Sequence, residues 1–281
     1  MGYGGRVRWA LGGPMAGKKL VPISLLANNP LKVEQRTRKV DDGAGGVIDQ
    51  PFKFPVWLEP SAHGRTPLGD RQRLRLDIFA DDLIAFMDHL QVKRGVLGGI
   101  SMGAAVALNA ASRYPERCTA LVLVRPAWLD GSMCATAVAA YREVVKCLAI
   151  EPSPQSALEK LERSEIYRAV VQQSADAGKS LLGQVRCVIL DPSLREAALA
   201  RLSHLPSGQL SIDLPRLGAV SVPTLVLATL NDPIHPLSFA QSLAAAIPRA
   251  LYVELAPKQL DDGPHIHEVN VQVVKFLERI L

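Results

Sequence analysis

The sequence has few aromatic residues and no dense cluster of basic ones. Aromatic residues make up 5% of the 281 residues, and 32 Lys and Arg residues against 27 Asp and Glu residues give a formal net charge of +5. The basic residues are scattered along the chain, whereas proteins that grip nucleic acid gather them into stripes. We therefore expect a solvated basic surface and no nucleic-acid partner.

Long apolar runs are also missing. No stretch approaches the roughly 20 apolar residues of a membrane-spanning helix, and residues 1–17 lack the unbroken apolar core of a secretory signal. The 4 cysteines show no C-x-x-C spacing, which is typical of reduced thiols in a cytosolic protein. The sequence thus predicts no membrane partner and a cytoplasmic location.

Motifs for metals and cofactors are absent as well. The chain contains no H-E-x-x-H, no His or Asp cluster at ligand spacing, and no strand followed by G-x-G-x-x-G. We expect neither a metal nor a cofactor, and a small-molecule substrate is the predicted partner. The sequence makes no prediction about oligomeric state.

What is present is an alternation of strand-like and helix-like segments in a chain that is 48% hydrophobic. The pattern predicts helices over 76–90, directly after Ser101, near 237–246, and at the end of the chain, where Val269 and Val273 share a face with later apolar residues. The predicted strands are 20–27, 51–60, 94–100, 119–124, 222–230 and 250–255. Strands that alternate with crossover helices imply an α/β fold, with a mostly parallel central sheet covered by helices on both faces.

The pattern changes in the middle of the chain. Strand-like runs largely vanish between about 129 and 215, and helical, proline-containing stretches replace them. We therefore predict a core formed by residues 1–128 and 216–281, interrupted by a helical cap insertion over residues 129–215.

The stretch "GGISMG" suggests where the chemistry lies. Gly99 and Gly103 flank Ser101 at G-x-S-x-G spacing, between a predicted strand and a predicted helix. A strand that turns sharply into a helix needs small residues on either side of its apex, and the apex residue is strained and exposed at the sheet edge. Ser101 is therefore the candidate nucleophile.

A serine nucleophile needs a base, and the base needs an acid that orients it. Asp232 follows the predicted strand at 222–230, and His265 and His267 come shortly before the final helix, so the chain order is Ser, Asp, His. Asp130 is a reserve for the acid. His235 lies in a proline-flanked loop and is interpreted as structural.

At this point the sequence resembles the α/β-hydrolase superfamily. The matching segments are "FADDLIAFMDHLQV", "GGISMGAAVALNAASRYPERCTALVLV", "VPTLVLATLNDPIHP" and "HEVNVQVVKFL". The resemblance implies Ser101 as nucleophile, Asp232 as acid, His265 as base, and the backbone N–H of Met102 as half of an oxyanion hole. A serine in place of the aspartate nucleophile argues against dehalogenase or epoxide-hydrolase chemistry.

The N-terminal segment departs from the pattern of that superfamily. Ala27 and Asn28 stand where its members carry a His-Gly pair, so the second oxyanion donor would be the N–H of Asn29. Pro30 has no N–H to donate.

The resulting prediction is an enzyme, a cofactor-independent serine hydrolase of the carboxylic ester hydrolase type. It would act on an ester, a lactone or a related carbonyl compound through an acyl-enzyme. The alternatives are acyl transfer or C–C bond hydrolysis by the same residues, and a non-catalytic hydrolase-like binding protein.

Overall fold

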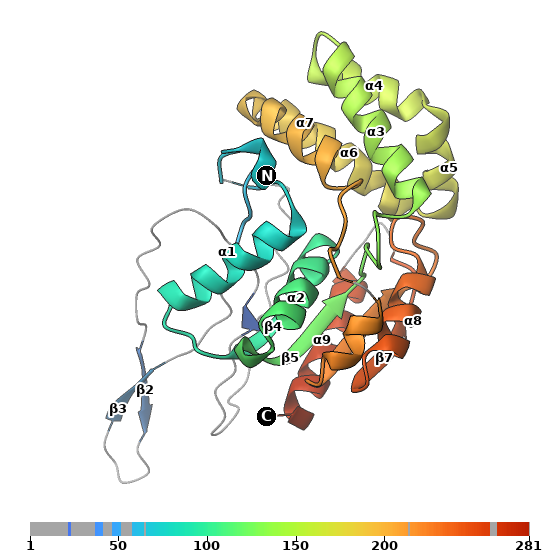
Figure 1. Ribbon diagram of the computed structural model, residues 1–281. Helices are drawn as coiled ribbons and strands as arrows, with labels where there is room; N and C mark the ends of the chain where they lie inside the picture. The colour runs from blue at the N-terminus through green and yellow to red at the C-terminus, as the bar shows by residue number, and fades with distance from the viewer. Residues whose placement is uncertain are drawn as a thin grey trace.

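A parallel sheet lies at the centre of the computed structural model (Figure 1). The model describes residues 22–23, 37–41, 47–51, 58–64, 66–212, 214–258 and 263–280, and of the first three ranges only the backbone. The sheet has the order β1-β4-β5-β6-β7, and every neighbouring pair is parallel. Its strands are β1 (Pro22–Ile23), β4 (Gly95–Ile100), β5 (Cys118–Val124), β6 (Thr224–Thr229) and β7 (Ala250–Leu255).

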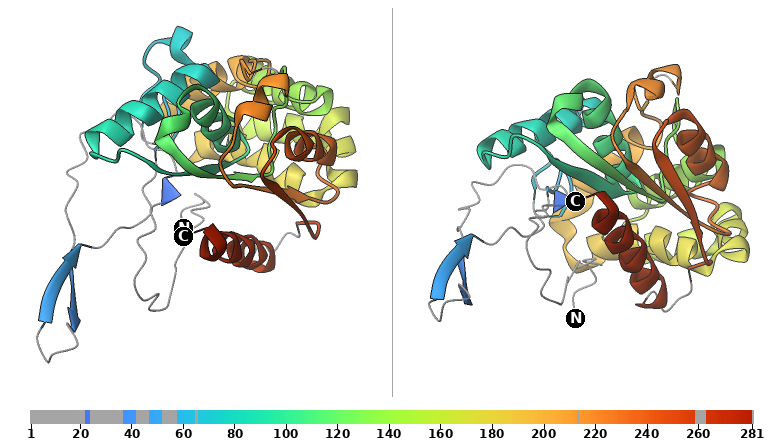
Figure 2. Two further views of the ribbon diagram at one scale, coloured as in Figure 1. Left: turned by 60° about the horizontal axis from the view of Figure 1, so that its bottom comes forward. Right: turned by 90° about the horizontal axis from the view of Figure 1, so that it is seen from below.

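Helices cover both faces of this sheet (Figure 2). On β5, Leu121 and Leu123 face one core cluster with helices α1, α2 and α8, whereas Val122 and Val124 face a second cluster with α9. This division follows from the two-residue period of a strand, and a strand buried on both faces is apolar at nearly every position. The four helices are α1 (Leu76–His89), α2 (Met102–Arg113), α8 (Leu237–Ala246) and α9 (Gly263–Ile280).

Five further helices lie between β5 and β6, and we call α3–α7 the helical layer. They lie beyond the carboxyl end of β5, toward which its arrow points in Figure 1. Residues 125–212 contain no strand. The helices are α3 (Ala135–Ile150), α4 (Pro154–Arg163), α5 (Glu165–Gln173), α6 (Ala175–Leu190) and α7 (Arg195–His204).

Three serines divide the helical layer into short helices. The side chains of Ser153, Ser164 and Ser174 each accept a hydrogen bond from a backbone N–H in the first turn of α4, α5 and α6. Such a cap stabilises a helix by about 1 kcal/mol and fixes where it begins. The chain therefore turns at each serine, and the helices fold back on one another instead of forming one long rod.

A buried amide side chain joins α2 to the segment that leaves the helical layer. Asn109 of α2 is 0% exposed, and its Nδ2 donates a hydrogen bond to the Leu210 carbonyl oxygen at 2.6 Å. Leu210 belongs to the segment that returns from α7 to β6. A buried amide must find such a partner, so this contact fixes the returning chain against the helix that follows Ser101.

The structure confirms the α/β class and most of the predicted elements. The predicted helices at 76–90 and 237–246 are α1 and α8, and the predicted strands from 94 onward are β4 to β7. Of the predicted strand 20–27, only β1 lies among the described residues. Of the predicted strand 51–60, residues 58–60 form no strand and 52–57 lie outside the described residues.

One ribbon was not predicted. β2 (Thr37–Asp41) and β3 (Val47–Pro51) pair antiparallel as a separate two-stranded sheet. Both segments are short and carry charged or polar residues without apolar alternation, so the sequence pattern gave no strand signal. Short 3-10 helices span Arg71–Arg73, Pro115–Arg117, Pro192–Leu194 and Leu214–Ala219.

The membrane prediction concerns helices that are long and apolar. Among the described helices, none has the length and apolar character needed to cross a bilayer.

Candidate active site

Ser101 forms the apex of the turn between β4 and α2. Its backbone has φ 56 and ψ −112, which is a strained conformation for a residue with a side chain. Its N–H donates to the Val124 carbonyl oxygen at 2.9 Å, and its own carbonyl accepts from the N–H of Ala104 at 3.1 Å. The strained apex expected from the glycine spacing is therefore present, held by β5 on one side and by α2 on the other.

Close backbone packing requires glycine at two positions near this turn. A Cβ on Gly99 would lie 2.4 Å from the carbonyl carbon of Gly103, and a Cβ on Gly98 would lie 2.9 Å from the Val122 carbonyl oxygen. Real Cβ atoms do not approach backbone atoms this closely, so β4 would have to move away from α2 at Gly99 and from β5 at Gly98. The close approach predicted from G-x-S-x-G is thus observed at Gly99.

His235 lies against the serine. Its Nε2 is 2.9 Å from Ser101 Oγ, and its Nδ1 is 2.9 Å from Asp232 Oδ2. With the proton on Nδ1, the ring donates to the carboxylate and leaves Nε2 to accept the serine proton. Asp232 Oδ1 also accepts from the N–H groups of Ile234 and His235, at 3.0 and 3.2 Å. The carboxylate therefore shapes the loop that carries the imidazole.

The structure thus brings two of the three predicted residues together and supplies a different histidine. His265 lies in the first turn of α9, is 8% exposed, and its Nδ1 has no hydrogen-bond partner among the described residues. The sequence analysis places His265 before the final helix, but α9 already begins at Gly263. The missed signal is the turn Asp-Pro-Ile-His, which returns the histidine to the aspartate 3 residues before it.

Three further residues were predicted for the site, namely Met102, Asn29 and Asp130. Met102 is the first residue of α2, where a backbone N–H has no partner within its helix and the helix dipole favours negative charge. Asn29 lies outside the described residues. Asp130, the reserve acid, is exposed, and Asp232 rather than Asp130 contacts the histidine at Ser101.

Arg125 is a site residue that sequence reasoning missed. It directly follows β5 and, like Ser101, has a positive φ, of 49°. Its Nε and Nη2 donate to Asp232 Oδ2 at 2.9 and 2.5 Å, and Nη2 lies 3.4 Å from Nδ1 of His235. The side chains of Arg125 and Asp232 are only 11% and 3% exposed, so this is a largely desolvated ion pair.

These contacts determine the ionisation of Asp232 and His235. Burial raises the pKa of the Asp232 carboxyl, but the hydrogen bond and charge of His235 together with Arg125 lower that pKa well below its ordinary value of 3.8. Burial lowers the pKa of His235 below 6.5, and the charge of Arg125 lowers it further although Asp232 raises it. The site therefore holds an ionised carboxylate and a neutral imidazole at neutral pH.

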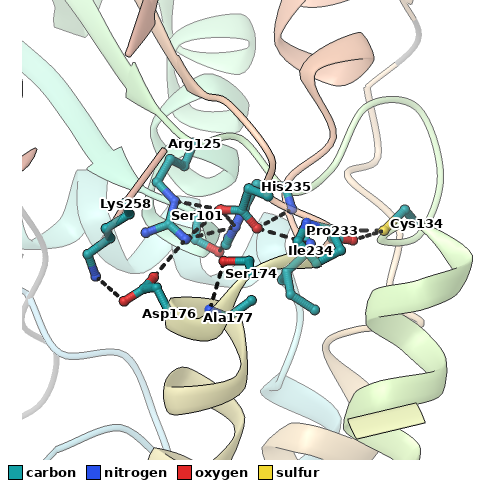
Figure 3. A network of polar contacts seen from close by, with 11 residues as sticks. Ser101, Arg125, Cys134, Ser174, Asp176, Ala177, Pro233, Ile234, His235 and Lys258 are labelled. Atoms are coloured by element: carbon teal, nitrogen blue, oxygen red, sulfur yellow. Dashed lines mark hydrogen bonds and ion pairs between the residues drawn. The ribbon is translucent and has the colours of Figure 1, made fainter. Parts of the chain in front are cut away.

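The helical layer reaches the same site through Asp176 of α6 (Figure 3). Asp176 Oδ1 is 2.9 Å from Lys258 Nζ, and its Oδ2 is 3.7 Å from Arg125 Nη2. Lys258 follows β7. Among the described residues, no group of three or more His, Cys, Asp or Glu side chains is arranged to hold a metal ion.

The fold and the site define an α/β enzyme whose polar site lies at the carboxyl edge of a parallel sheet. A family model described as the alpha/beta hydrolase fold matches residues 58–163. The chain is 28% identical over 235 residues to 3-oxoadipate enol-lactonase 2 of Acinetobacter baylyi. The alignment covers 80% of this chain and 79% of that protein.

Further similarities agree with this class. The chain is 29% identical over 161 residues to 2-hydroxy-6-oxo-6-phenylhexa-2,4-dienoate hydrolase of Comamonas testosteroni, covering 57% of this chain and 54% of that one. The enol-lactonase structure from Burkholderia xenovorans superimposes with a TM-score of 0.61 at 19% identity, covering 95% and 94% of the two chains. The chain therefore has the α/β-hydrolase fold, and the two named relatives are an enol-lactonase and a dienoate hydrolase.

The glycine contact generates a stability prediction. Replacing Gly99 by alanine should destabilise the fold by about 1–3 kcal/mol, because the new Cβ meets the Gly103 backbone. Urea unfolding followed by circular dichroism measures the loss. Gly131→Ala is the matched control, because a Cβ there meets nothing within 4 Å. Equal stability of the two variants would contradict this account of the turn.

Proposed function

We propose that the protein is a cofactor-independent serine hydrolase that cleaves an ester or lactone through an acyl-enzyme on Ser101. The observation that carries the proposal is the hydrogen-bonded chain from Ser101 Oγ through His235 to Asp232, with both links at 2.9 Å. A serine hydroxyl becomes a nucleophile when a neighbouring base removes its proton, and a carboxylate that orients the base stabilises the imidazolium that forms.

The geometry gives each residue a step. His235 Nε2 takes the proton as Ser101 Oγ attacks the substrate carbonyl, and it returns that proton to the leaving group. The oxyanion of the tetrahedral intermediate would face the N–H of Met102 at the positive end of α2, a donor of a kind that contributes about 3 kcal/mol. Asn29 is proposed as the second donor. Water activated by His235 then releases the acyl group.

Two histidines compete for the role of base in this proposal. The family resemblance implies His265, whereas the hydrogen bonds favour His235, which meets both Ser101 and Asp232. Within the part of the chain that the structure describes, Nδ1 of His265 makes no hydrogen bond to a carboxylate that would orient its ring. We therefore assign the base to His235 and keep His265 as the competing assignment.

The substrate class follows from the relatives. The match to an enol-lactonase extends over about four-fifths of both chains, which favours a cyclic ester. The shorter match to a dienoate hydrolase keeps C–C bond hydrolysis as the second candidate, because the same Ser101 would serve both. We also propose that residues 129–215 form a cap domain over this site, and that the protein acts in the cytoplasm on a small molecule, consistent with its four free thiols.

Labelling distinguishes the proposed enzyme from a non-catalytic hydrolase-like binding protein. A fluorophosphonate probe should label wild-type protein at Ser101, because the serine is polarised by His235. Peptide mapping by mass spectrometry identifies the site, and Ser101→Ala is the unlabelled control. A folded wild-type protein that stays unlabelled would support the binding protein and overturn the proposed enzyme.

The two histidine assignments are separated by substitution. His235→Ala should reduce kcat with a p-nitrophenyl ester or a lactone by at least a thousandfold, whereas His265→Ala should reduce it by less than about tenfold. Initial rates on folded, monodisperse variants measure both effects. The reverse ranking would return the base to His265.

The acidic limb of the pH profile of kcat/KM tests whether His235 acts as a neutral base. Burial holds the pKa of His235 below 6.5, so kcat/KM should stay level at neutral pH and fall with a midpoint below 6.5. The unfolded chain binds this proton more readily than the fold does, so folding stability also decreases as the pH falls below 6.5. Circular dichroism at each pH separates the two effects, and a midpoint above 7 would contradict the buried base.

A further inference from the structure

Asp176 is a buried carboxylate that the proposed reaction does not use. It is 2% exposed, and it lies in the first turn of α6, within the helical layer. Its Oδ1 pairs with Lys258 at 2.9 Å, whereas its Oδ2 makes no hydrogen bond to any described residue. Since a buried carboxylate oxygen without a hydrogen bond is costly, its position calls for an electrostatic explanation.

Arg125 is a cation close to that oxygen. Nη2 of Arg125 lies 3.7 Å from Asp176 Oδ2 and 2.5 Å from Asp232 Oδ2, so one guanidinium group faces two carboxylates (Figure 3). The same Nη2 is 3.4 Å from His235 Nδ1. Arg125 therefore connects a helix of the helical layer to the acid and the proposed base of the core.

Arg125 has opposite effects on the acid and on the base. It stabilises ionised Asp232, but its positive charge opposes the imidazolium that His235 must become during the reaction. Asp176 carries the negative charge that offsets this opposition. In a site this poorly exposed to solvent, charges a few ångströms apart are weakly screened, so the offset acts directly on His235.

Among the described residues, the ion-pair network that includes Arg125 and reaches His235 balances in charge. Asp232 and Asp176 supply two negative charges, and Arg125 and Lys258 supply two positive ones. His265 of α9 also faces Arg125 and Lys258, and burial and these two cations lower its pKa, which keeps it neutral.

The described surroundings also include two neutral side chains, Cys134 directly before α3 and Tyr141 within it. Burial raises the pKa of the Cys134 thiol and of the Tyr141 hydroxyl, and the charge of Asp232 raises both further. Neither group carries charge at neutral pH. Removing Asp176 would therefore leave an uncompensated positive charge beside the proposed base.

We propose that Asp176 is a positioning residue that sets the basicity of His235 through Arg125, so that the seating of α6 against the core controls the proposed hydrolase. The inference rests on the proposed function. Asp176 acts on the reaction through Arg125 and the local field.

The test is the pH dependence of Asp176→Asn. The uncompensated positive charge should move the acidic limb of kcat/KM by about one pH unit toward lower pH. A less basic imidazole should also lower the plateau kcat about tenfold with little change in KM. A carboxylate with a merely structural role would lower activity at every pH without moving the limb, and that result overturns the proposal.

Glu196→Gln is the matched control. Glu196 of α7 also pairs across the boundary between the helical layer and the core, with Arg71 at 2.8 Å, but the two side chains are 71% and 56% exposed. Glu196→Gln should leave the acidic limb of kcat/KM at its wild-type position. A limb that moves equally in Glu196→Gln would show that any loosened boundary contact has this effect, and it would overturn the specific role of Asp176.

Lys258→Gln keeps the proposal testable if Asp176→Asn fails to fold. Removing this cation should move the limb in the opposite direction, toward higher pH, and the double variant should return it toward the wild-type position. An unmoved limb in Lys258→Gln overturns the inference. Failure of the proposed function is distinct, because wild-type protein would then neither turn over ester nor react with the fluorophosphonate probe.

Discussion

The backbone contact between Gly99 and Gly103 is the constraint on which the site depends. A Cβ on Gly99 would lie 2.4 Å from the Gly103 backbone, so the absence of a side chain lets α2 turn back sharply from β4. The turn leaves Ser101 at positive φ, beyond the carboxyl end of β4. Because the neighbouring strands run parallel, their carboxyl ends meet at the same edge and bring the arginine, the aspartate and the lysine of the site to the serine.

The sequence predicted the core because its signals are local. A buried parallel strand is a short apolar run, and α1 and α9 show the spacing of one buried face, so each element is visible within its own residues. The ribbon of β2 and β3 has no such signal, since its strands are short and polar. The element bounds near the site were less accurate for the same reason: α9 begins at Gly263, within a segment that the sequence pattern assigned to a loop.

The site was predictable only as far as local sequence encodes it. Ser101 and Asp232 follow buried strands, and a strand end is visible in the sequence. His235 was interpreted as structural, because a histidine in a turn beside an aspartate has the same local pattern whether or not it reaches a serine. Arg125 and Asp176 meet across an ion pair that joins the end of β5 to α6. Such a pair depends on how the helical layer sits on the sheet, which no spacing within the sequence specifies.

The proposed acid and base form one unit, because both lie on the loop after β6. Asp232 Oδ2 orients the imidazole of His235, while its Oδ1 holds the backbone of the same loop. Their alignment with Ser101 therefore depends on this loop and on the turn between β4 and α2. The field around the pair comes from elsewhere, since Arg125 follows β5 and Asp176 belongs to the helical layer. On this proposal, the geometry of proton transfer is set within the core, and the strength of the base is set across its boundary. Changes of charge in α6 can therefore retune the proposed hydrolase without moving its nucleophile.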